Sequence, residues 1–333
     1  MYKTTIKLAV IGALGFVSSA AFAAGSFCAL SSAPTGSAYI NLYNDGRTVP
    51  PLAGPAVTSL QSRLNFGSDS PYAGAAGSCQ ITGLSNDATA PLSGYGLQVT
   101  SNTQNIFATD GVTVIGNVTQ RIWRNTSTSP ASCILGTKVT LGTNAFYNGS
   151  QYFELNDIAV GGYSGSGSVN VGYFAASSTP ALSPVYRAGR TFTSVQHRAY
   201  KYGGTQAERQ NNGTGYLDLP TIGGSSTLAI NGVNSGISGT TVATATAAQQ
   251  DAQVNSNWVD FTVDAGFQDD DGGTNPISSI AYVEFSCNSD SASTINSTWR
   301  KAGALRLRQT AQENTTFHEI SLTGYAPPGA TVP

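Results

Sequence analysis

The sequence predicts a mainly β protein, either an antiparallel β-sandwich or a barrel-like fold, with one or two short helices. Three observations predict this class: many short runs rich in β-branched and aromatic residues, clusters of Gly, Asn, Ser and Pro between them, and few runs with helical spacing. No segment repeats at a fixed period, which argues against a solenoid or a propeller.

The first residues are typical of an export signal. Two lysines precede an apolar run from Leu8 to Val17, and the small-residue site Ala21-Phe22-Ala23 follows. This order of a positive, an apolar and a cleavable region predicts that residues 1–23 are removed after export. No later run is long and apolar enough to span a bilayer, so the sequence predicts no transmembrane segment.

The predicted strands lie between turn-rich segments along the rest of the chain. Each is short and rich in β-branched or aromatic side chains, and Gly, Asn, Ser or Pro residues bound it. In chain order they are Gly94–Ser101, Gly111–Val118, Thr137–Gly142, Gly167–Phe174, Arg190–Tyr202, Ser226–Val233 and Phe317–Tyr325.

The stretch Asn257–Cys287 shows the clearest strand pattern. Apolar and polar residues alternate from Val259 to Phe267 and again from Ile280 to Cys287. A period of two is the signature of a half-buried strand. We therefore predict a long-looped hairpin whose tip carries the acidic sequence QDDDGGTNP.

Helix is predicted at two places. Gly54–Phe66 has a proline where a first helical turn tolerates it, and its apolar residues fall on one face. Ala243–Asn255 is rich in Ala and Gln. A third segment, Arg300–Gln312, fits a helix or a strand, because its leucines and arginines alternate.

Composition divides the chain into several regions. A β-rich domain is expected over 24–221, and a loop or linker rich in Gly, Ser, Thr and Ala over 222–248. The C-terminal β region, 249–325, is either part of the same domain or a second unit. Residues 326–333 form a Pro-rich tail.

The four cysteines, Cys28, Cys79, Cys133 and Cys287, all follow the export signal. An even number of widely spaced cysteines in an exported chain favours two disulfides over a metal site, which would normally contain a C-x-x-C pair. Three pairings are possible. Cys28–Cys79 with Cys133–Cys287 is preferred because its first bridge closes a short loop.

The charge of the chain excludes some partners. Only 10% of the residues are charged, and loss of Lys3 and Lys7 with the signal moves the formal net charge from −2 to −4. The only block of like charges is acidic. Nothing in this pattern attracts nucleic acid or an anionic membrane surface.

Residues for catalysis are scarce. The chain holds two histidines, His197 and His318, and neither lies in a zinc-protease motif. A glycosidase needs only two carboxylates. Glu154 and Asp157, which lie beside aromatic residues, form the weak candidate pair, although charged residues on a solvent-facing surface near a turn fit the same sequence.

Two further features suggest ligands. Asp269, Asp270 and Asp271 could supply oxygen ligands to a calcium ion, since adjacent carboxylates repel one another and a cation relieves that repulsion. The alternative is an ordinary turn tip. Trp123 lies between Arg121 and Arg124, and is either a sugar-stacking platform or a core residue.

These observations favour a binding or structural role outside the cytoplasm. We expect a secreted, periplasmic or cell-surface protein without enzymatic activity, either an adhesin for a glycan or surface ligand or a structural or filament subunit that assembles with itself. The alternatives are an extracellular carbohydrate-active enzyme that uses a carboxylate pair, and a periplasmic accessory protein whose fold calcium stabilises.

Overall fold

The computed structural model describes ten stretches of the chain. They are residues 27–35, 38–42, 79–81, 83–101, 103–147, 149–174, 185–194, 253–268, 275–309 and 318–333. The expected export signal, the 222–248 linker and the acidic tip Asp269–Asp271 lie outside these stretches.

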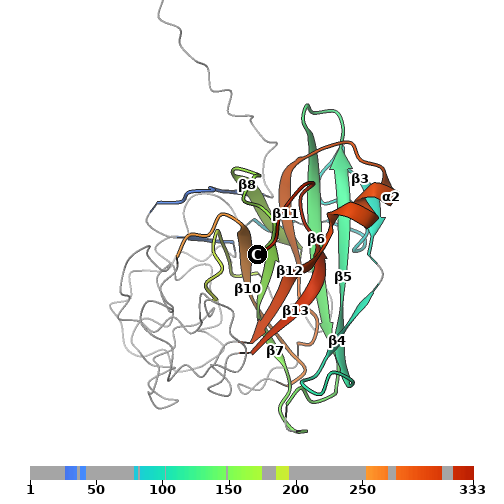
Figure 1. Cartoon of the computed structure of the whole chain (residues 1–333), viewed down its shortest axis with the longest axis vertical. Helices are drawn as coiled ribbons and strands as arrows, with labels where there is room; N and C mark the ends of the chain where they lie inside the picture. Colours follow the sequence, from blue (N-terminus) through green and yellow to red (C-terminus); the bar gives the residue numbers. More distant parts are fainter. Residues whose placement is uncertain are drawn as a thin grey trace, which may run out of the picture.

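Two open sheets form the fold, and every strand pair in them is antiparallel (Figure 1). The first sheet has the order β1 (Cys28–Leu30), β8 (Val169–Phe174), β11 (Ile280–Cys287), β6 (Ala131–Leu141), β5 (Val114–Asn125) and β3 (Gly96–Thr100), with β4 (Gln104–Phe107) also paired to β5. The second sheet has the order β13 (His318–Tyr325), β12 (Arg300–Gln309), β7 (Glu154–Gly161), β10 (Trp258–Gly266), β9 (Arg187–Gly189) and β2 (Tyr39–Asn41). The predicted mainly β class is confirmed, and the architecture is a sandwich because neither sheet closes into a barrel.

The core lies between the two sheets. Alternate residues of β10, such as Val259 and Phe261, pack against residues of the first sheet such as Leu135 and Val283, and all of them are buried in one cluster. Burial of each large apolar side chain contributes about 2 kcal/mol to stability. Strands from before residue 195 and after residue 252 share both sheets, so the two parts of the chain bury this core together.

Most predicted strands that fall on described residues are confirmed. The runs at Gly94, Thr137, Gly167 and Phe317 correspond to β3, β6, β8 and β13, and the run at Gly111 corresponds to a longer β5. The ambiguous segment Arg300–Gln312 is strand β12 up to Gln309. The strand predicted from Arg190 is wrong over Arg190–Ser194, where only Thr191 forms an isolated bridge, to Val254. The run Ser226–Val233 lies outside the described residues.

The predicted hairpin is wrong, because β10 and β11 lie in different sheets. Gly266 pairs with Asn275, so the base of the acidic loop is closed as in a hairpin. The chain then pairs with β6 through Ile277 and Thr140 and enters the first sheet. Alternation showed which residues face the core, but both sheets face the same core, so it could not show which sheet each strand joins.

The helical predictions fare less well. Gly54–Phe66 lies outside the described residues, and the described end of Ala243–Asn255 is extended rather than helical. A helical turn that was not predicted, α2 (Ala292–Thr294) continued by η4 (Ile295–Trp299), precedes β12. Ser291 caps it by accepting a hydrogen bond from the Thr294 backbone N–H at 3.2 Å.

The preferred disulfide pairing is confirmed. Cys28 pairs with Cys79 and Cys133 with Cys287, at Cα–Cα distances of 5.6 and 5.8 Å. The second bridge links the neighbouring strands β6 and β11. The first holds Cys79 against β8, where the Cys79 carbonyl accepts from the Tyr173 N–H.

Candidate functional site

The outer face of the second sheet carries a line of buried polar side chains. Because Val259 and Phe261 of β10 point into the core, Asp260 and Thr262 point away from the first sheet. Strand register places one residue from each of five neighbouring strands in a row, which we call the charge row. Its members are Glu319, Arg308, Asp157, Thr262 and Arg187.

Two arginines hold Glu319 at one end of the charge row. Arg308 Nε donates to Glu319 Oε2 at 3.0 Å, and Arg306 Nη1 donates to Oε1 at 2.9 Å. Arg306 also donates to the Gly303 carbonyl at 3.0 Å. The Arg308 side chain is fully buried, so water does not solvate its charge. The ion pair with Glu319 therefore matters more for stability than it would for an exposed arginine.

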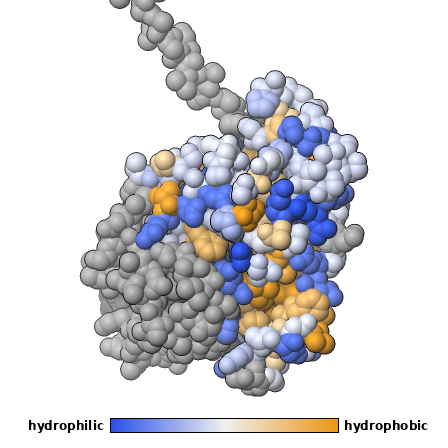
Figure 2. Space-filling model, viewed as in Figure 1, coloured by the Kyte–Doolittle hydropathy of each residue, from blue (hydrophilic) through white to orange (hydrophobic). Residues whose placement is uncertain are grey.

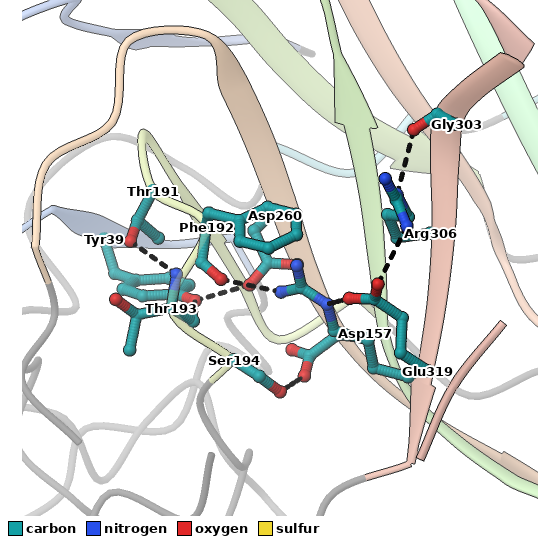
Figure 3. A network of polar contacts seen from close by, with 11 residues as sticks. Tyr39, Asp157, Thr191, Phe192, Thr193, Ser194, Asp260, Gly303, Arg306 and Glu319 are labelled. Atoms are coloured by element: carbon teal, nitrogen blue, oxygen red, sulfur yellow. Dashed lines mark hydrogen bonds and ion pairs between the residues drawn. The ribbon is translucent and has the colours of Figure 1, made fainter. Parts of the chain in front are cut away.

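A cover segment, residues 191–194, lies over the charge row (Figure 3). Arg308 Nη1 donates to the Phe192 carbonyl at 2.8 Å, and the guanidinium lies 3.8 Å from the centre of the Phe192 ring. The Ser194 hydroxyl donates to the Asp157 carboxylate. Phe192 also packs on Trp258, so an aromatic layer screens the ion pairs from water.

Tyr39 and Asp260 share a short hydrogen bond beside the row. The Tyr39 hydroxyl lies 2.6 Å from Asp260 Oδ2 and 2.5 Å from the Thr193 carbonyl oxygen. A hydroxyl has one proton to donate, so a protonated Asp260 would satisfy both contacts: the carboxyl donates to Tyr39, and Tyr39 donates to Thr193. Burial raises the pKa of Asp260 to about 6, although the nearby Arg308 charge opposes the shift.

Gly189 makes room for this tyrosine. A Cβ at Gly189 would lie 2.7 Å from Tyr39 Cε1, closer than side-chain atoms approach one another. The ring therefore packs close to β9 at Gly189, and its hydroxyl reaches Asp260. Burial and the Asp260 charge both raise the pKa of Tyr39 well above its usual value.

A third buried arginine, Arg190, follows β9. Its Nη2 donates to the carbonyls of Tyr163 at 2.9 Å and of Gly167 at 3.1 Å. Burial lowers its pKa to about 10. Arg190 thus holds the β7–β8 connection against the end of the core.

The candidate catalytic pair is built into the second sheet. Glu154 and Asp157 are both buried, so neither carboxylate opens to solvent. Glu154 Oε1 accepts from Asn156 Nδ2 at 2.6 Å, and Asp157 lies in the charge row. The expectation that charged residues here face solvent near a turn is wrong, because these side chains are enclosed.

Trp123 has the core role that was its alternative. Its ring is fully buried on the outer face of the first sheet, and its Nε1 donates to the Ala88 carbonyl at 3.0 Å. It packs with Tyr282 and Phe174 in a small second cluster. Neither face of the ring is open to stack on a sugar.

The segment 83–95 covers Trp123 and is tied down by polar contacts. Lys138 Nζ lies 2.6 Å from Asp87 Oδ2, and the Tyr95 hydroxyl donates to Glu284. Glu284 also accepts from Asn170 at 2.8 Å. Each sheet therefore has a covered outer face: apolar packing covers the first, and ion pairs cover the second.

The remaining candidate residues from the sequence are the two histidines and the three aspartates Asp269–Asp271. His318 packs on Phe146 and Tyr147 with ring centres 5.1 and 5.6 Å away, and burial lowers its pKa. His197 lies outside the described residues. Within the described stretches, no group of three or more His, Cys, Asp or Glu side chains could hold a metal ion. Calcium binding by Asp269–Asp271 stays a prediction.

The sequence interpretation missed the charge row and Tyr39. The available signal was that charges in VDFTVD, RLRQ and HEISL alternate with apolar residues in a chain with very few charges. Such residues were assigned to a solvent face, because alternation alone cannot show that a further layer covers it.

No family model matches this chain, and comparison with curated proteins and with solved structures gave no match either. Among the described residues, no helix is long and apolar enough to cross a membrane.

Proposed function

We propose that this protein is a non-enzymatic structural subunit of an extracellular assembly, which accepts an extended segment along the edge formed by β3 and β4. The observation that carries the proposal is this edge, which runs from Gly96 to Phe107 and contains no charged residue and no proline. Proteins commonly place charges or prolines on edge strands to prevent pairing with other chains.

The edges on the opposite side of the sandwich are short. β1 and β2 contain three residues each. The segment Cys79–Ile81 lies between their sheets: Cys79 N–H donates to the carbonyl of Leu42, just after β2, at 3.1 Å, and Ile81 N–H donates to the carbonyl of Tyr173 in β8, the neighbour of β1, at 2.7 Å. The Cys28–Cys79 disulfide holds this segment in place.

The β13 edge carries the protection that the β3–β4 edge lacks. Glu319 of β13 is paired with two arginines, and the strand runs into the proline-containing tail after Tyr325. The Tyr325 N–H donates to Gln120 Oε1 at 2.9 Å, which ties its end to β5 of the other sheet. A pairing segment would meet a charge here and no charged residue at β3–β4.

The β3–β4 edge lies at the right-hand margin of the molecule in Figure 1 and pairs only with β5 among the described strands. Leu97 and Phe107 are 43% and 42% exposed at its two ends. Backbone pairing supplies affinity in strand addition, and alternate side chains supply specificity. The two disulfides support a location in an oxidising compartment outside the cytoplasm.

Light scattering and electron microscopy of the purified protein over a range of concentrations test this function. Ordered oligomers or filaments that dissociate on dilution would support it. A strict monomer that releases sugars from polysaccharide would overturn it in favour of the carbohydrate-active enzyme. A strict monomer that binds immobilised glycans would instead support an adhesin.

A further inference from the structure

We infer that the end of the core beside the β7–β8 connection binds one small monovalent anion, such as chloride, next to the guanidinium of Arg190. This site is internal, and β8 and β9 lie away from β3 in their sheets. The inference therefore does not depend on assembly through the β3–β4 edge.

The backbone directs Arg190 toward the core. Ala188 of β9 is buried in the core cluster, and side chains alternate between faces along a strand, so Arg190 points to the same side as Ala188. The Arg190 N–H donates to the Ala38 carbonyl, and its carbonyl accepts from the Asn255 N–H, both at 2.8 Å. The backbone is thus fixed by two neighbouring segments, and the side chain is fully buried.

Only part of the Arg190 guanidinium has hydrogen-bond partners. The N–H groups of Nη2 donate to the carbonyls of Tyr163 and Gly167. Nε and Nη1 are buried, and neither has a partner among the residues that the structure describes. Of the described side chains, only that of Tyr163 acts electrostatically on the pKa of Arg190, so no described carboxylate lies close enough to balance its charge.

Tyr163 adds one more donor at the same place. Its ring is fully buried against Phe285, with ring centres 5.6 Å apart, and lies 5.9 Å from the Arg190 guanidinium. Its hydroxyl is buried and has no partner within the described stretches. Burial raises the pKa of Tyr163, although the Arg190 charge opposes the shift, so the phenol keeps a proton to donate. The free groups here are donors, and their complement is an acceptor.

Charge decides which acceptor fits. With a pKa of about 10, Arg190 is charged at neutral pH, and a buried charge without a counter-charge is costly. Arg308, which is equally buried, has Glu319 as its counter-charge. Charged side chains in the hydrophilic patches of Figure 2 need none, because water solvates them. Water beside Arg190 would accept hydrogen bonds but leave the charge, whereas a monovalent anion does both. A dianion would leave a net negative charge in the core.

The β7–β8 connection gives the ion a way in. It consists largely of glycine and serine, its residues 164, 165, 167 and 168 are exposed, and Gly162 and Gly167 have positive φ angles of 98° and 63°. Segments with few buried apolar contacts open more readily than the sheets that they join. Gly162 also lies against Ala326 and Ala330 of the C-terminal tail. An anion at Arg190 therefore stabilises both the connection and the tail.

Thermal unfolding of the full chain in sodium chloride and in sodium gluconate, at equal ionic strength, tests the site. Gluconate is too large to enter. The melting temperature should be about 3 °C higher in chloride at about ten times its dissociation constant, because a ligand that binds only the folded protein stabilises it. Arg190→Met should lose this difference. The control, Arg300→Met, removes the same charge at an exposed position and should keep it.

A smaller change covers the case in which Arg190→Met does not fold. Tyr163→Phe removes only the hydroxyl and should weaken the chloride dependence at least threefold. Equal melting of the wild type in both salts, or an unchanged chloride dependence in Tyr163→Phe or Arg190→Met, overturns the inference.

Bromide locates the ion directly. Crystals of the wild type grown in sodium bromide should show an anomalous scattering peak in contact with the Arg190 guanidinium. Bromide found only at surface residues would be an adventitious ion only and would overturn the inference, as would an ordered water in contact with Arg190 and no bromide there.

Discussion

At the scale of single residues, hydrogen bonds of the Tyr39 hydroxyl connect strands and loops that are far apart in the sequence. Tyr39 lies near the N-terminal end of the described residues, Asp260 lies in β10, and Thr193 belongs to the cover segment. Their hydrogen bonds require an uncharged carboxyl or a strained sharing of one hydroxyl proton. The protonation of Asp260 therefore affects how firmly the cover segment holds to the sheet.

Replacement of Asp260 with Asn should remove the pH dependence of stability that comes from this carboxyl. The pKa of Asp260 is about 6 in the folded protein and near its ordinary 3.8 in the unfolded chain, so the fold binds this proton more tightly. The stabilisation is full below about pH 4 and is lost as the pH rises through about 6. Wild type should therefore lose melting temperature relative to Asp260→Asn between these values.

The measurement is thermal unfolding of both proteins from pH 3.5 to pH 7.5, with the difference between them plotted against pH. Other carboxylates shift both curves together, so only the difference reports on Asp260. A difference that stays constant over this range would show that the carboxyl keeps an ordinary pKa in the fold.

Arg308 and Arg306 form a matched pair for the ion network. Both donate to Glu319, but the Arg308 side chain is fully buried, whereas that of Arg306 is 20% exposed. Arg308→Gln should lower the free energy of unfolding by about 3 kcal/mol or more, since it leaves a buried carboxylate with fewer partners. Arg306→Gln should cost about 1 kcal/mol. Chemical denaturation measures both, and equal losses would argue against a role for burial.

At the scale of strands, each sheet needs glycine where a large aromatic ring crosses its outer face. A Cβ at Gly136 would lie 2.8 Å from Trp123 and 2.9 Å from Tyr282. Gly161 has the same relation to Trp258, at 2.9 Å. These rings anchor the layers that cover the sheets, so the missing side chains are part of the packing.

Gly136→Ala should destabilise the fold by about 1 to 3 kcal/mol, because two rigid rings must move to admit the methyl group. The control is Gly165→Ala in the β7–β8 connection, where a Cβ would meet no atom within 4 Å. Urea unfolding of the two variants compares them. If Gly136→Ala were as stable as Gly165→Ala, the rings of Trp123 and Tyr282 would be able to move aside at little energetic cost.

Strand positions were readable from the sequence, whereas strand partners were not. Alternation located β10 and β11 correctly because each has one face in the shared core. The same alternation suggested a hairpin between β10 and β11, since local spacing carries no information about which sheet receives a strand. The covered outer faces were missed for a related reason: Asp157 and Asp260 are buried by a cover segment distant in sequence.

At the scale of the whole molecule, the two halves of the described chain depend on each other. Sheet neighbours such as β6 and β11, or β7 and β12, are far apart in sequence. Folding must close these long loops before the core can form, which costs chain entropy and makes folding slow. The disulfides lower that cost, and their benefit should depend on loop length.

Removing the two bridges separately should give unequal losses of stability. Cys133 and Cys287 are separated by 154 residues, and Cys28 and Cys79 by 51. Each bridge restricts the unfolded chain by about 2 to 5 kcal/mol, and the longer loop should add roughly 1 kcal/mol. Cys133→Ala with Cys287→Ala should thus lower the free energy of unfolding more than Cys28→Ala with Cys79→Ala.

The two bridges lie at different distances from β3 and β4, so their removal should affect assembly differently as well as stability. Cys28–Cys79 lies on the opposite side of the sandwich, so its loss should leave self-association of the folded protein unchanged. Cys133–Cys287 lies in β6 and β11, and β6 pairs with β5, the strand that supports the open edge. Denaturation and sedimentation of both double variants separate stability from assembly. If loss of Cys28–Cys79 abolished association in a protein that remained folded, the interface would lie on the β1–β2 side instead.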